Sequence, residues 1–400
     1  MFPLPAEEVN VLQDQLFSYL IVGLSKLRNA TSAQYTYPYP RELQHAMNFL
    51  ALKMGDRYPD TLPGLLTILH TSIEHWLPEH IDLPEGLYPE FPVLSNNDLH
   101  EIASEFLENN ALSGAIDFEA IGHARDNVLV KQWIEQVRSD YAQAEDDNIA
   151  HRIANDYAQA RYTIIKHPIE SRMSLKKYLL TNLYIDTVMG FYEPTSEAQH
   201  RLDGNEITGY RVCEQCGPVR RYPDGHTNSL KPQACRGRCP FSDNWVTVQD
   251  DNLLVLKRGI QLRTMIPGRA EIDLYHQLYN VERQKPRRRK VREVELYPGV
   301  DAYDIRITLA NGLVLAIDVK DYQDANALGM KIREAGVTLP NHYSELRWDE
   351  AFYIVPEYRE RVQPGYRDQA LRQIGELPEH VHLMTDVQFL NELAELLGAI

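Results

Sequence analysis

A β-hairpin is the clearest pattern of polar and apolar positions in the chain. Residues 304–309 (DIRITL) alternate between polar and apolar side chains, and residues 313–319 (LVLAIDV) form a short apolar run rich in β-branched residues. Between them stands Asn311-Gly312, a pair that favours tight turns between antiparallel strands. The pattern therefore predicts two antiparallel strands joined at this pair.

Segments with the pattern of a strand alternate with segments with the pattern of a helix before and after the hairpin. Apolar runs predict strands, and apolar residues at helical spacing predict helices between them. We expect strands at 291–297, 351–356 and 381–385, and helices at 324–336, 364–375 and 386–398. A further helical stretch is expected after an N-cap at Asp250 or Asp251, with an interruption at Pro267-Gly268. This order of elements predicts a mixed sheet with helices on its faces.

The first half of the chain has helical periodicity throughout. Apolar residues recur at helical spacing, and Pro, Gly and Asn separate the stretches. The expected helices cover 11–27, 42–54, 63–77, 96–110, 126–144, 153–168 and 174–192. We therefore predict a multidomain protein, with an all-α half over residues 1–205 that could dock a partner and an α/β core over residues 249–400.

All four cysteines of the chain lie between these two parts. Cys213-x2-Cys216 and Cys235-x3-Cys239 are separated by 18 residues. Four thiolates in two close pairs suit tetrahedral Zn²⁺, and four protein ligands leave no open position for a catalytic water. We therefore predict a structural zinc ribbon over residues 206–248. The alternative is a redox-active or simply buried set of thiols.

Charge is unevenly distributed, although the formal net charge is -16 at pH 7. Residues 1–205 hold 15 Lys and Arg against 29 Asp and Glu, whereas residues 211–292 hold 17 against 8. A local basic excess can bind a polyanion even in an acidic protein, through salt-sensitive contacts to phosphates. The alternative is a solvated connecting loop. The densest part supplies the candidate nucleic-acid-binding residues Arg283, Lys285, Arg287, Arg288, Arg289, Lys290 and Arg292.

Two carboxylates and an ammonium group lie on the predicted hairpin. Asp304 opens the first strand, Asp318 lies near the end of the second, and Lys320 follows on the same face as Asp318. Carboxylate oxygens can hold Mg²⁺ against a phosphate, and a nearby lysine can orient or activate the attacking water. The trio suits phosphodiester hydrolysis. Solvated charges at the rim of a sheet would give the same pattern.

Asp304, thirteen intervening residues and then Asp318-Val319-Lys320 resemble the PD-(D/E)xK signature of the restriction-endonuclease-like nuclease superfamily. A Pro-Gly pair at 298–299 stands just before the first strand, as part of the same likeness. Asp318 takes the position where Glu is commoner, and Asp reaches one methylene less far. The resemblance implies a restriction-endonuclease-like fold for residues 249–400. It also implies a Mg²⁺-dependent endonuclease that acts on nucleic acid, with DNA favoured.

The resemblance also implies roles for individual residues. Asp304, Asp318 and the carbonyl of Val319 would bind Mg²⁺ or Mn²⁺, and Lys320 would position or deprotonate the attacking water. Glu271, on the preceding helix, is the candidate for a further catalytic acid; a first-turn glutamate favoured by the helix dipole is the alternative. Three residues after the motif could assist, although a structural or surface role is expected for each: Tyr322, Gln323 and Lys331.

The helical half, the four cysteines and the D-x13-DVKDY core together resemble a narrower family, the nuclease encoded beside prokaryotic Piwi proteins in defence modules. The segment IKHPIES at 165–171 adds to this likeness. The resemblance implies a role against phage or plasmids, with a Piwi-like protein and a helicase as partners. Double-strand cutting by one site per chain would favour a homodimer or sequential nicking.

Two alternatives to an active nuclease are a catalytically inactive, nucleic-acid-binding or scaffolding subunit of such a complex, and a zinc-ribbon regulator of transcription. The intact trio argues against both, and the regulator also lacks a recognisable recognition helix. The N-terminus has no signal-peptide pattern, and no apolar run reaches 18 residues. We therefore expect a cytoplasmic protein without membrane contact.

Overall fold

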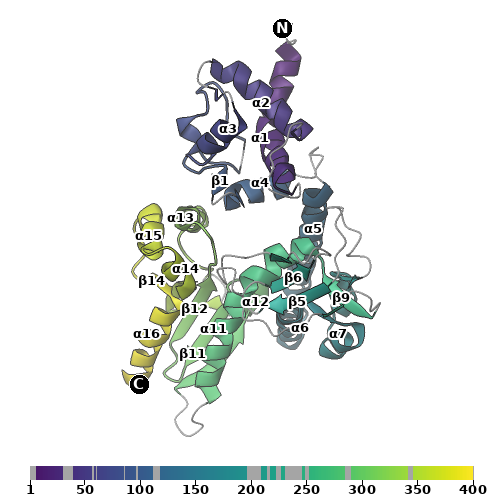
Figure 1. The fold of residues 1–400 in the computed structure, drawn as a ribbon. Helices are drawn as coiled ribbons and strands as arrows, with labels where there is room; N and C mark the ends of the chain where they lie inside the picture. Colours follow the sequence, from purple (N-terminus) through teal and green to yellow (C-terminus); the bar gives the residue numbers. More distant parts are fainter. Residues whose placement is uncertain are drawn as a thin grey trace. The chain divides into compact units, whose positions relative to one another are not determined.

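The computed structural model divides into two compact units, residues 1–125 and 126–400 (Figure 1). No helix in the part of the chain that it describes is long and apolar enough to cross a membrane. The described residues are 6–29, 39–55, 58–59, 61–84, 86–95, 98–110, 118–195, 209–213, 217–221, 227–229, 246–247, 252–283, 290–340 and 346–399.

The first unit is mainly helical, as the periodicity predicts. Gly23 lets two helices approach closely, because a Cβ at this position would lie 2.4 Å from the backbone nitrogen of Leu43. Two predicted helices are shorter than expected: one ends at Leu69, and another begins at Glu101 after a short hairpin. The elements are α1 (Ala6–Asn29), α2 (Arg41–Met54), α3 (Leu62–Leu69), the short helix Ile73–His75, β1 (Leu94–Ser95), β2 (Asp98–Leu99) and α4 (Glu101–Asn110).

The next part joins helices to a small antiparallel sheet of order β3-β9-β4. Its elements are α5 (Phe118–Ala142), α6 (Asp147–Lys166), β3 (Ile169–Ser171), α7 (Arg172–Tyr178), α8 (Ile185–Met189), β4 (Tyr192–Pro194) and β9 (Leu253–Leu256). The helix predicted over 174–192 is thus two short helices and a strand. Residues 253–256, expected to be helical, form the central strand because they pair with strands on both sides.

A four-stranded antiparallel sheet of order β7-β6-β5-β8 contains the first predicted cysteine ligand. Its strands are β5 (Gly209–Cys213), β6 (Gly217–Arg221), β7 (Thr227–Ser229) and β8 (Val246–Thr247). Cys213 ends β5 and is the register partner of Gly217 in β6. The other predicted zinc ligands, Cys216, Cys235 and Cys239, lie outside the described residues. The zinc ribbon therefore stays a prediction.

The helix expected to break at Pro267-Gly268 continues through it. A short helix, α10 (Arg258–Ile260), passes into a π-helical turn (Gln261–Met265) and then into α11 (Ile266–Arg283). Proline lacks the amide hydrogen that the interior of a helix uses, and the wider π turn directly before Pro267 changes the hydrogen-bond pattern at this point. The interruption predicted at Pro267-Gly268 was wrong, and the predicted helix is confirmed only from Arg258 onward.

The C-terminal core is a five-stranded mixed sheet of order β10-β11-β12-β13-β14 between two helical layers. The pairs from β10 to β12 are antiparallel, and those from β12 to β14 are parallel. The strands are β10 (Val291–Leu296), β11 (Ile305–Leu309), β12 (Val314–Val319), β13 (Glu350–Val355) and β14 (Val381–Thr385). The helices are α13 (Ala325–Glu334), α14 (Glu357–Val362), α15 (Tyr366–Ile374) and α16 (Asp386–Ala399). The segment labelled α12 (Pro298–Asp301) is a short turn in the loop before Asp304, because Gly299, Val300 and Asp301 have positive φ. The predicted mixed sheet with flanking helices is confirmed.

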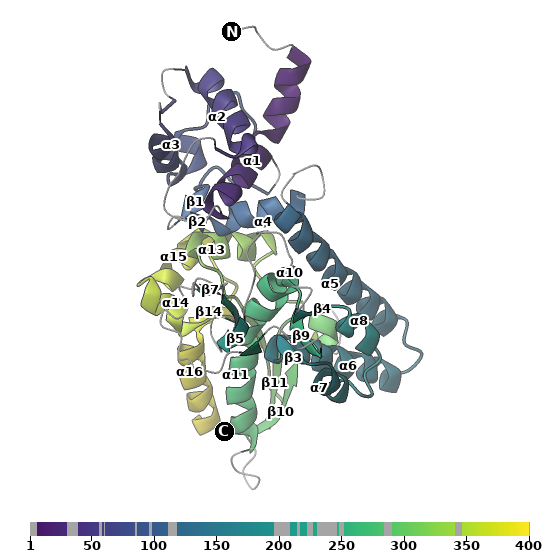
Figure 2. The same ribbon diagram turned by 45° about the vertical axis from the view of Figure 1, so that its right-hand side comes forward.

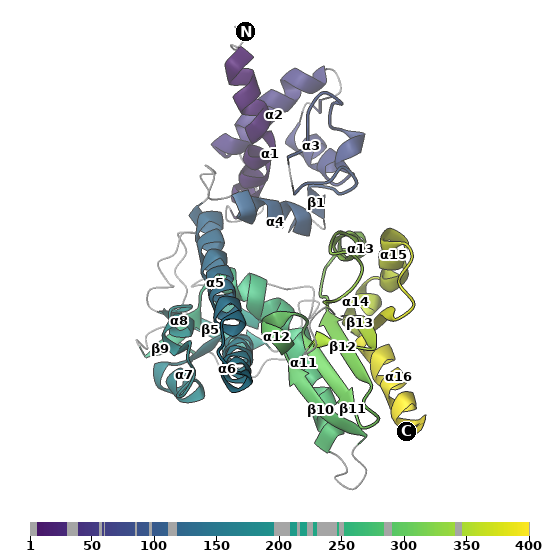
Figure 3. The same cartoon turned by 180° about the vertical axis from the view of Figure 1, so that it is seen from behind.

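Strand alternation decides which helices cover which face. Ile305, Ile317 and Phe352 point to the side of α11 and α16, and in Figure 2 α11 crosses in front of β10 and β11. Ala316 and Tyr353 point to the side of α13 and α15. Figure 3 shows the sheet from the opposite side, with β10, β11 and β12 in view. Side chains two positions from Ala316 therefore point towards α13.

Candidate active site

The hairpin that carries the predicted acids forms as expected. Ile305 and Ile317 are register partners of antiparallel β11 and β12. At the turn, the amide of Gly312 donates to the carbonyl of Leu309 at 3.0 Å, and Gly312 has a φ of +91°, a conformation that glycine adopts without strain. Asp304 directly precedes Ile305 and Asp318 directly follows Ile317, so both acids lie at the same end of the β11-β12 pair.

The carboxylate of Asp304 is buried and held by the backbone. Its Oδ2 accepts a hydrogen bond from the amide of Val319 at 2.6 Å. The Asp304 amide donates to the carbonyl of Ile317 at 3.0 Å, and its own carbonyl accepts from the amide of Tyr297 at 2.7 Å. The position of this carboxylate is therefore fixed by the strand on one side and by the preceding loop on the other.

Asp318 and Lys320 form an ion pair beside this buried acid. Lys320 Nζ lies 2.7 Å from Asp318 Oδ2, with the lysine side chain about one-third exposed. The Lys320 amide donates to the carbonyl of Ile354, which holds the residue against β13. The following residue, Asp321, pairs with the buried Arg359 at 2.8 Å. The backbone at Lys320 is therefore fixed by β13 and by the ion pair of the next residue.

Electrostatic coupling links the acids and the lysine. Burial raises the pKa of Asp304 well above its usual range, Glu271 and Asp318 raise it further, and Lys320 opposes them. Burial lowers the pKa of Lys320, but Asp318 and Asp304 outweigh this effect and the net shift is upward. The site is a cluster of like charges that a cation would stabilise.

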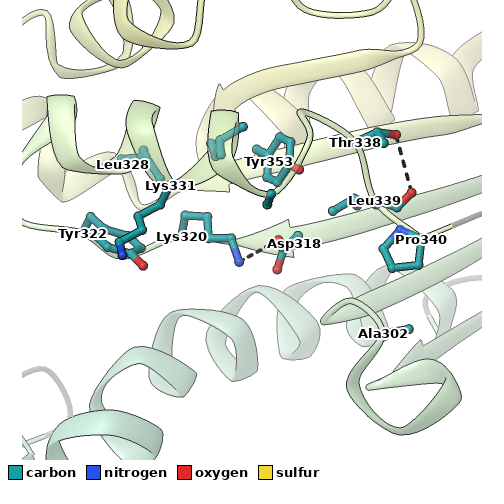
Figure 4. Close-up of a pocket in the computed structure, with 12 residues that line it drawn as sticks. Ala302, Asp318, Lys320, Tyr322, Leu328, Lys331, Thr338, Leu339, Pro340 and Tyr353 are labelled. Carbon is teal, nitrogen blue, oxygen red and sulfur yellow. Dashed lines mark hydrogen bonds and ion pairs between the residues drawn. The ribbon is translucent and has the colours of Figure 1, made fainter. Parts of the chain in front are cut away.

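A pocket of about 560 Å³ opens beside this pair. Figure 4 shows Lys320 directed towards Asp318, with Tyr322 and Lys331 to one side and Leu339 and Pro340 to the other. One part of the wall is therefore cationic and another is apolar. The remaining lining residues are Ala302, Leu328, Ile332, Ala335, Thr338 and Tyr353. Burial raises the pKa of Tyr353 to about 12, so its hydroxyl is protonated at neutral pH.

Glu271 lies in α11 near the acids, but it has other partners. Arg161 Nη2 donates to its two carboxylate oxygens at 3.2 and 3.1 Å, and the hydroxyl of Tyr297 donates to Oε2 at 2.6 Å. Burial raises its pKa, and Arg161 lowers it, with a net upward shift. Sequence reasoning missed Arg161. The available signal was a charge four residues after Tyr157 on a face that also carries Ile164 and Ile165.

The predicted nucleic-acid-binding cluster is only partly described. Lys290 donates from Nζ to the carbonyl of Leu397, and Arg292 is exposed on β10. Arg283 ends α11. The residues Lys285, Arg287, Arg288 and Arg289 lie outside the described part of the chain. A role for this cluster in binding nucleic acid stays a prediction.

The donors at the hairpin fit a small, hard cation. Within the described residues, no three His, Cys, Asp or Glu side chains are grouped so that they could hold a metal. Mg²⁺ commonly takes only one or two carboxylates and completes its octahedron with waters and substrate phosphate oxygens. Asp304 and Asp318 each have one carboxylate oxygen for which the bonds described above give no partner. This donor set suits Mg²⁺ or Mn²⁺ better than a metal that needs an all-protein cage.

Two family models match the chain. Residues 268–399 match the model described as "REase associating with pPIWI_RE", and residues 16–171 match the "pPIWI_RE three-gene island domain Y". No curated protein and no solved structure gives a match. One polypeptide therefore combines segments similar to two domains of pPIWI_RE three-gene islands, and these matches support a nuclease-related component of a Piwi-associated defence module.

Proposed function

We propose that the chain is a metal-dependent endonuclease that hydrolyses phosphodiester bonds in nucleic acid, with DNA favoured. The observation that carries the proposal is the end of the hairpin, where buried Asp304 and Asp318 come from paired strands and Lys320 lies 2.7 Å from Asp318 at a pocket. Asp318 raises the pKa of Asp304, because two carboxylates held near each other repel unless a cation compensates for them. A site of this kind is suited to binding a cation and an anionic substrate.

Asp304 and Asp318 would hold Mg²⁺ or Mn²⁺, with the carbonyl of Val319 and Glu271 as further candidates. The bound ion supplies Lewis-acid activation of the phosphoryl group and of water. Lys320, as a protonated ammonium, donates hydrogen bonds to the phosphate or to the attacking water and offsets negative charge. Its pairing with Asp318 keeps this ammonium beside the carboxylates.

The pocket gives the nucleic-acid backbone a place to approach. Lys331 lies in its wall and adds a second positive charge on the side away from Leu339 and Pro340. The basic residues of 283–292 would extend this charge along the backbone through sequence-independent contacts. These contacts would make binding sensitive to salt.

We propose a biological setting of defence against phage or plasmids. The descriptions of the two matched models name a restriction endonuclease that associates with pPIWI_RE and a domain of a three-gene island. A Piwi-like protein and a helicase of the same module are the proposed partners, and a homodimer would suit double-strand cutting. Zn²⁺ at Cys213, Cys216, Cys235 and Cys239 is the proposed structural metal.

Incubation of the purified full chain with labelled single- and double-stranded DNA and RNA tests the activity. We expect cutting with Mg²⁺ or Mn²⁺ and none with EDTA. Asp318→Ala and Lys320→Ala should each lower the cutting rate at least about 100-fold, since they remove groups assigned to the reacting phosphate.

Matched controls separate these losses from unfolding. Asp186→Asn and Lys177→Ala change exposed residues of α8 and α7 and should cut like the wild type. All four variants should melt near the wild-type temperature. Undiminished cutting by folded Asp318→Ala and Lys320→Ala proteins would refute the assignment. Metal-dependent binding without cutting by the wild type would instead favour a catalytically inactive subunit.

A further inference from the structure

A buried arginine joins the two segments that match different family models. Arg161 lies in α6, within residues 16–171, whereas its acidic partners lie within residues 268–399. The sequence separation between Arg161 and Glu271 is 110 residues. The side chain of Arg161 is only 13% exposed, so the contact belongs to the interior of the second unit.

Arg161 binds two acids with different nitrogens. Its Nη2 pairs with Glu271 at 3.1 Å, and its Nη1 pairs with Asp301. Nη1 also donates to the hydroxyl of Tyr157 at 3.1 Å, and the guanidinium lies 4.2 Å from the ring centroid of Tyr297. The planar guanidinium group of arginine has several N–H donors and can make these contacts at the same time. The ammonium group of lysine cannot reproduce this arrangement.

The loop held by Arg161 leads directly into Asp304. Tyr297, Val300 and Asp301 all have positive φ, at 53°, 57° and 66°, and Val300 is β-branched and fully buried. Non-glycine residues in this conformation cost of order 1–3 kcal/mol each and persist only where surrounding contacts fix them. The amide of Tyr297 also donates to the carbonyl of Asp304. Tyr297 thus contacts Asp304 directly, and only two residues separate Asp301 from Asp304.

We propose that Arg161 is a positioning residue of the metal site, which holds Glu271 and the loop 297–301 so that Asp304 and Asp318 can share a cation. The inference rests on the proposed function, because it assumes that the acids receive a metal. It also gives the segment similar to domain Y a direct part in the site: the acids of the nuclease-like segment are ordered by a side chain from the other segment.

Binding of Mn²⁺ to the full chain, measured by calorimetry without nucleic acid, tests this role. Arg161→Lys keeps a positive charge but loses the fork, and should weaken Mn²⁺ binding about 10-fold or more, the effect typical of groups that orient metal ligands. Asp301→Asn, at a partly exposed partner of Arg161, should weaken it in the same direction. The rise in melting temperature that Mn²⁺ gives the wild type should shrink in both variants.

Tyr162→Phe is the matched control. Tyr162 and His276 are hydrogen bonded at 3.0 Å between the same two helices, α6 and α11, so this variant loosens the helix contact without touching the acids. It should bind Mn²⁺ like the wild type. Equal loss in Tyr162→Phe, or wild-type affinity in folded Arg161→Lys, overturns the proposal. If Arg161→Lys does not fold, wild-type affinity in Asp301→Asn overturns it. A wild type that binds no Mn²⁺ would refute the metal site itself.

Discussion

At the scale of single residues, the hairpin places charges where a folded protein alone would avoid them. Asp304 is buried, and the charges of Glu271 and Asp318 both raise its pKa further. Burial of like charges lowers stability, and the positive φ values at 297–301 add backbone strain. Such costs in one small region are typical of a site maintained for binding or catalysis.

Asp304→Asn should therefore raise the melting temperature of the metal-free protein, by about 2–4 °C for each kcal/mol relieved. Asn keeps an oxygen that can accept from the Val319 amide but carries no charge. Because the folded pKa of Asp304 is raised, the wild type loses stability as pH rises through that pKa, so the difference should grow with pH. Thermal melts between pH 5 and pH 9 measure it.

Added Mn²⁺ supplies the control for this prediction. The ion should stabilise the wild type, since it binds only the folded acids, and should stabilise Asp304→Asn much less. A variant that melts below the wild type at every pH would show that the Asp304 carboxylate contributes stability rather than costing it.

The residue scale also shows what the sequence could predict about the site. The sequence predicts the site residues of the hairpin, because side chains alternate along a strand and a tight turn sets which residues of the two strands lie near each other. These residues are Asp304, Asp318 and Lys320. Arg161 was not found, because its contacts span more than 100 residues of sequence and nothing local reveals them. The double pairing of Glu271 with Arg161 and Tyr297 was missed for the same reason.

At the scale of elements, the strands of the C-terminal sheet were predicted better than the elements of the small sheet before it. β14 was predicted at its observed bounds, and β10, β11, β12 and β13 were predicted within one residue of theirs. The sequence predicts a helix where β9 forms, because four consecutive apolar residues have no clear period. Pairing with β3 and β4 makes this segment a strand. The helix predicted over 174–192 was wrong for a similar reason, because its apolar pattern continues across the gap between α7 and α8.

Helices α6 and α11 meet at a close contact that can be tested. A Cβ on Gly268 would lie 2.3 Å from Cδ1 of the buried Ile165. Gly268→Ala should therefore destabilise the fold by about 1–3 kcal/mol, as overpacking of a core does. Combining it with Ile165→Val, which removes Cδ1, should recover part of the loss. Urea denaturation of the three proteins measures both effects.

Gly398→Ala is the matched substitution in α16, where an added Cβ would meet no atom of the described residues within 4 Å. It should be neutral or slightly stabilising, because alanine favours helix over glycine by about 1 kcal/mol. If Gly268→Ala behaves like Gly398→Ala, the contact between α6 and α11 is looser than the geometry indicates.

At the scale of the whole molecule, the second unit unites parts of the chain that match different families. One continuous core contains residues of α5 and α6 together with residues of β9, α11 and the loop before Asp304. Trp133, Tyr157 and Tyr297 belong to it. The boundaries expected at 205 and 249 stay predictions. This core packs α11 and the loop before Asp304 against α5 and α6.

The predicted zinc ribbon has its own test at this scale. We expect about one zinc per purified chain by elemental analysis, because two cysteine pairs at this spacing suit a tetrahedral structural site. Cys213→Ser should lose the metal and become prone to aggregation, since structural zinc contributes directly to folding. A wild type that is metal-free and fully folded would contradict the prediction.

The pairing of β4 with β9 has a consequence for the stretch of chain between them. Pro194 and Leu254 are register partners, so the two ends of the cysteine-bearing stretch are held together by the small sheet. The entropy of closing a loop grows only slowly with its length, by about 0.6 kcal/mol for each doubling. A change in the length of this stretch should therefore cost the core around Arg161 little stability as long as β4 and β9 stay paired.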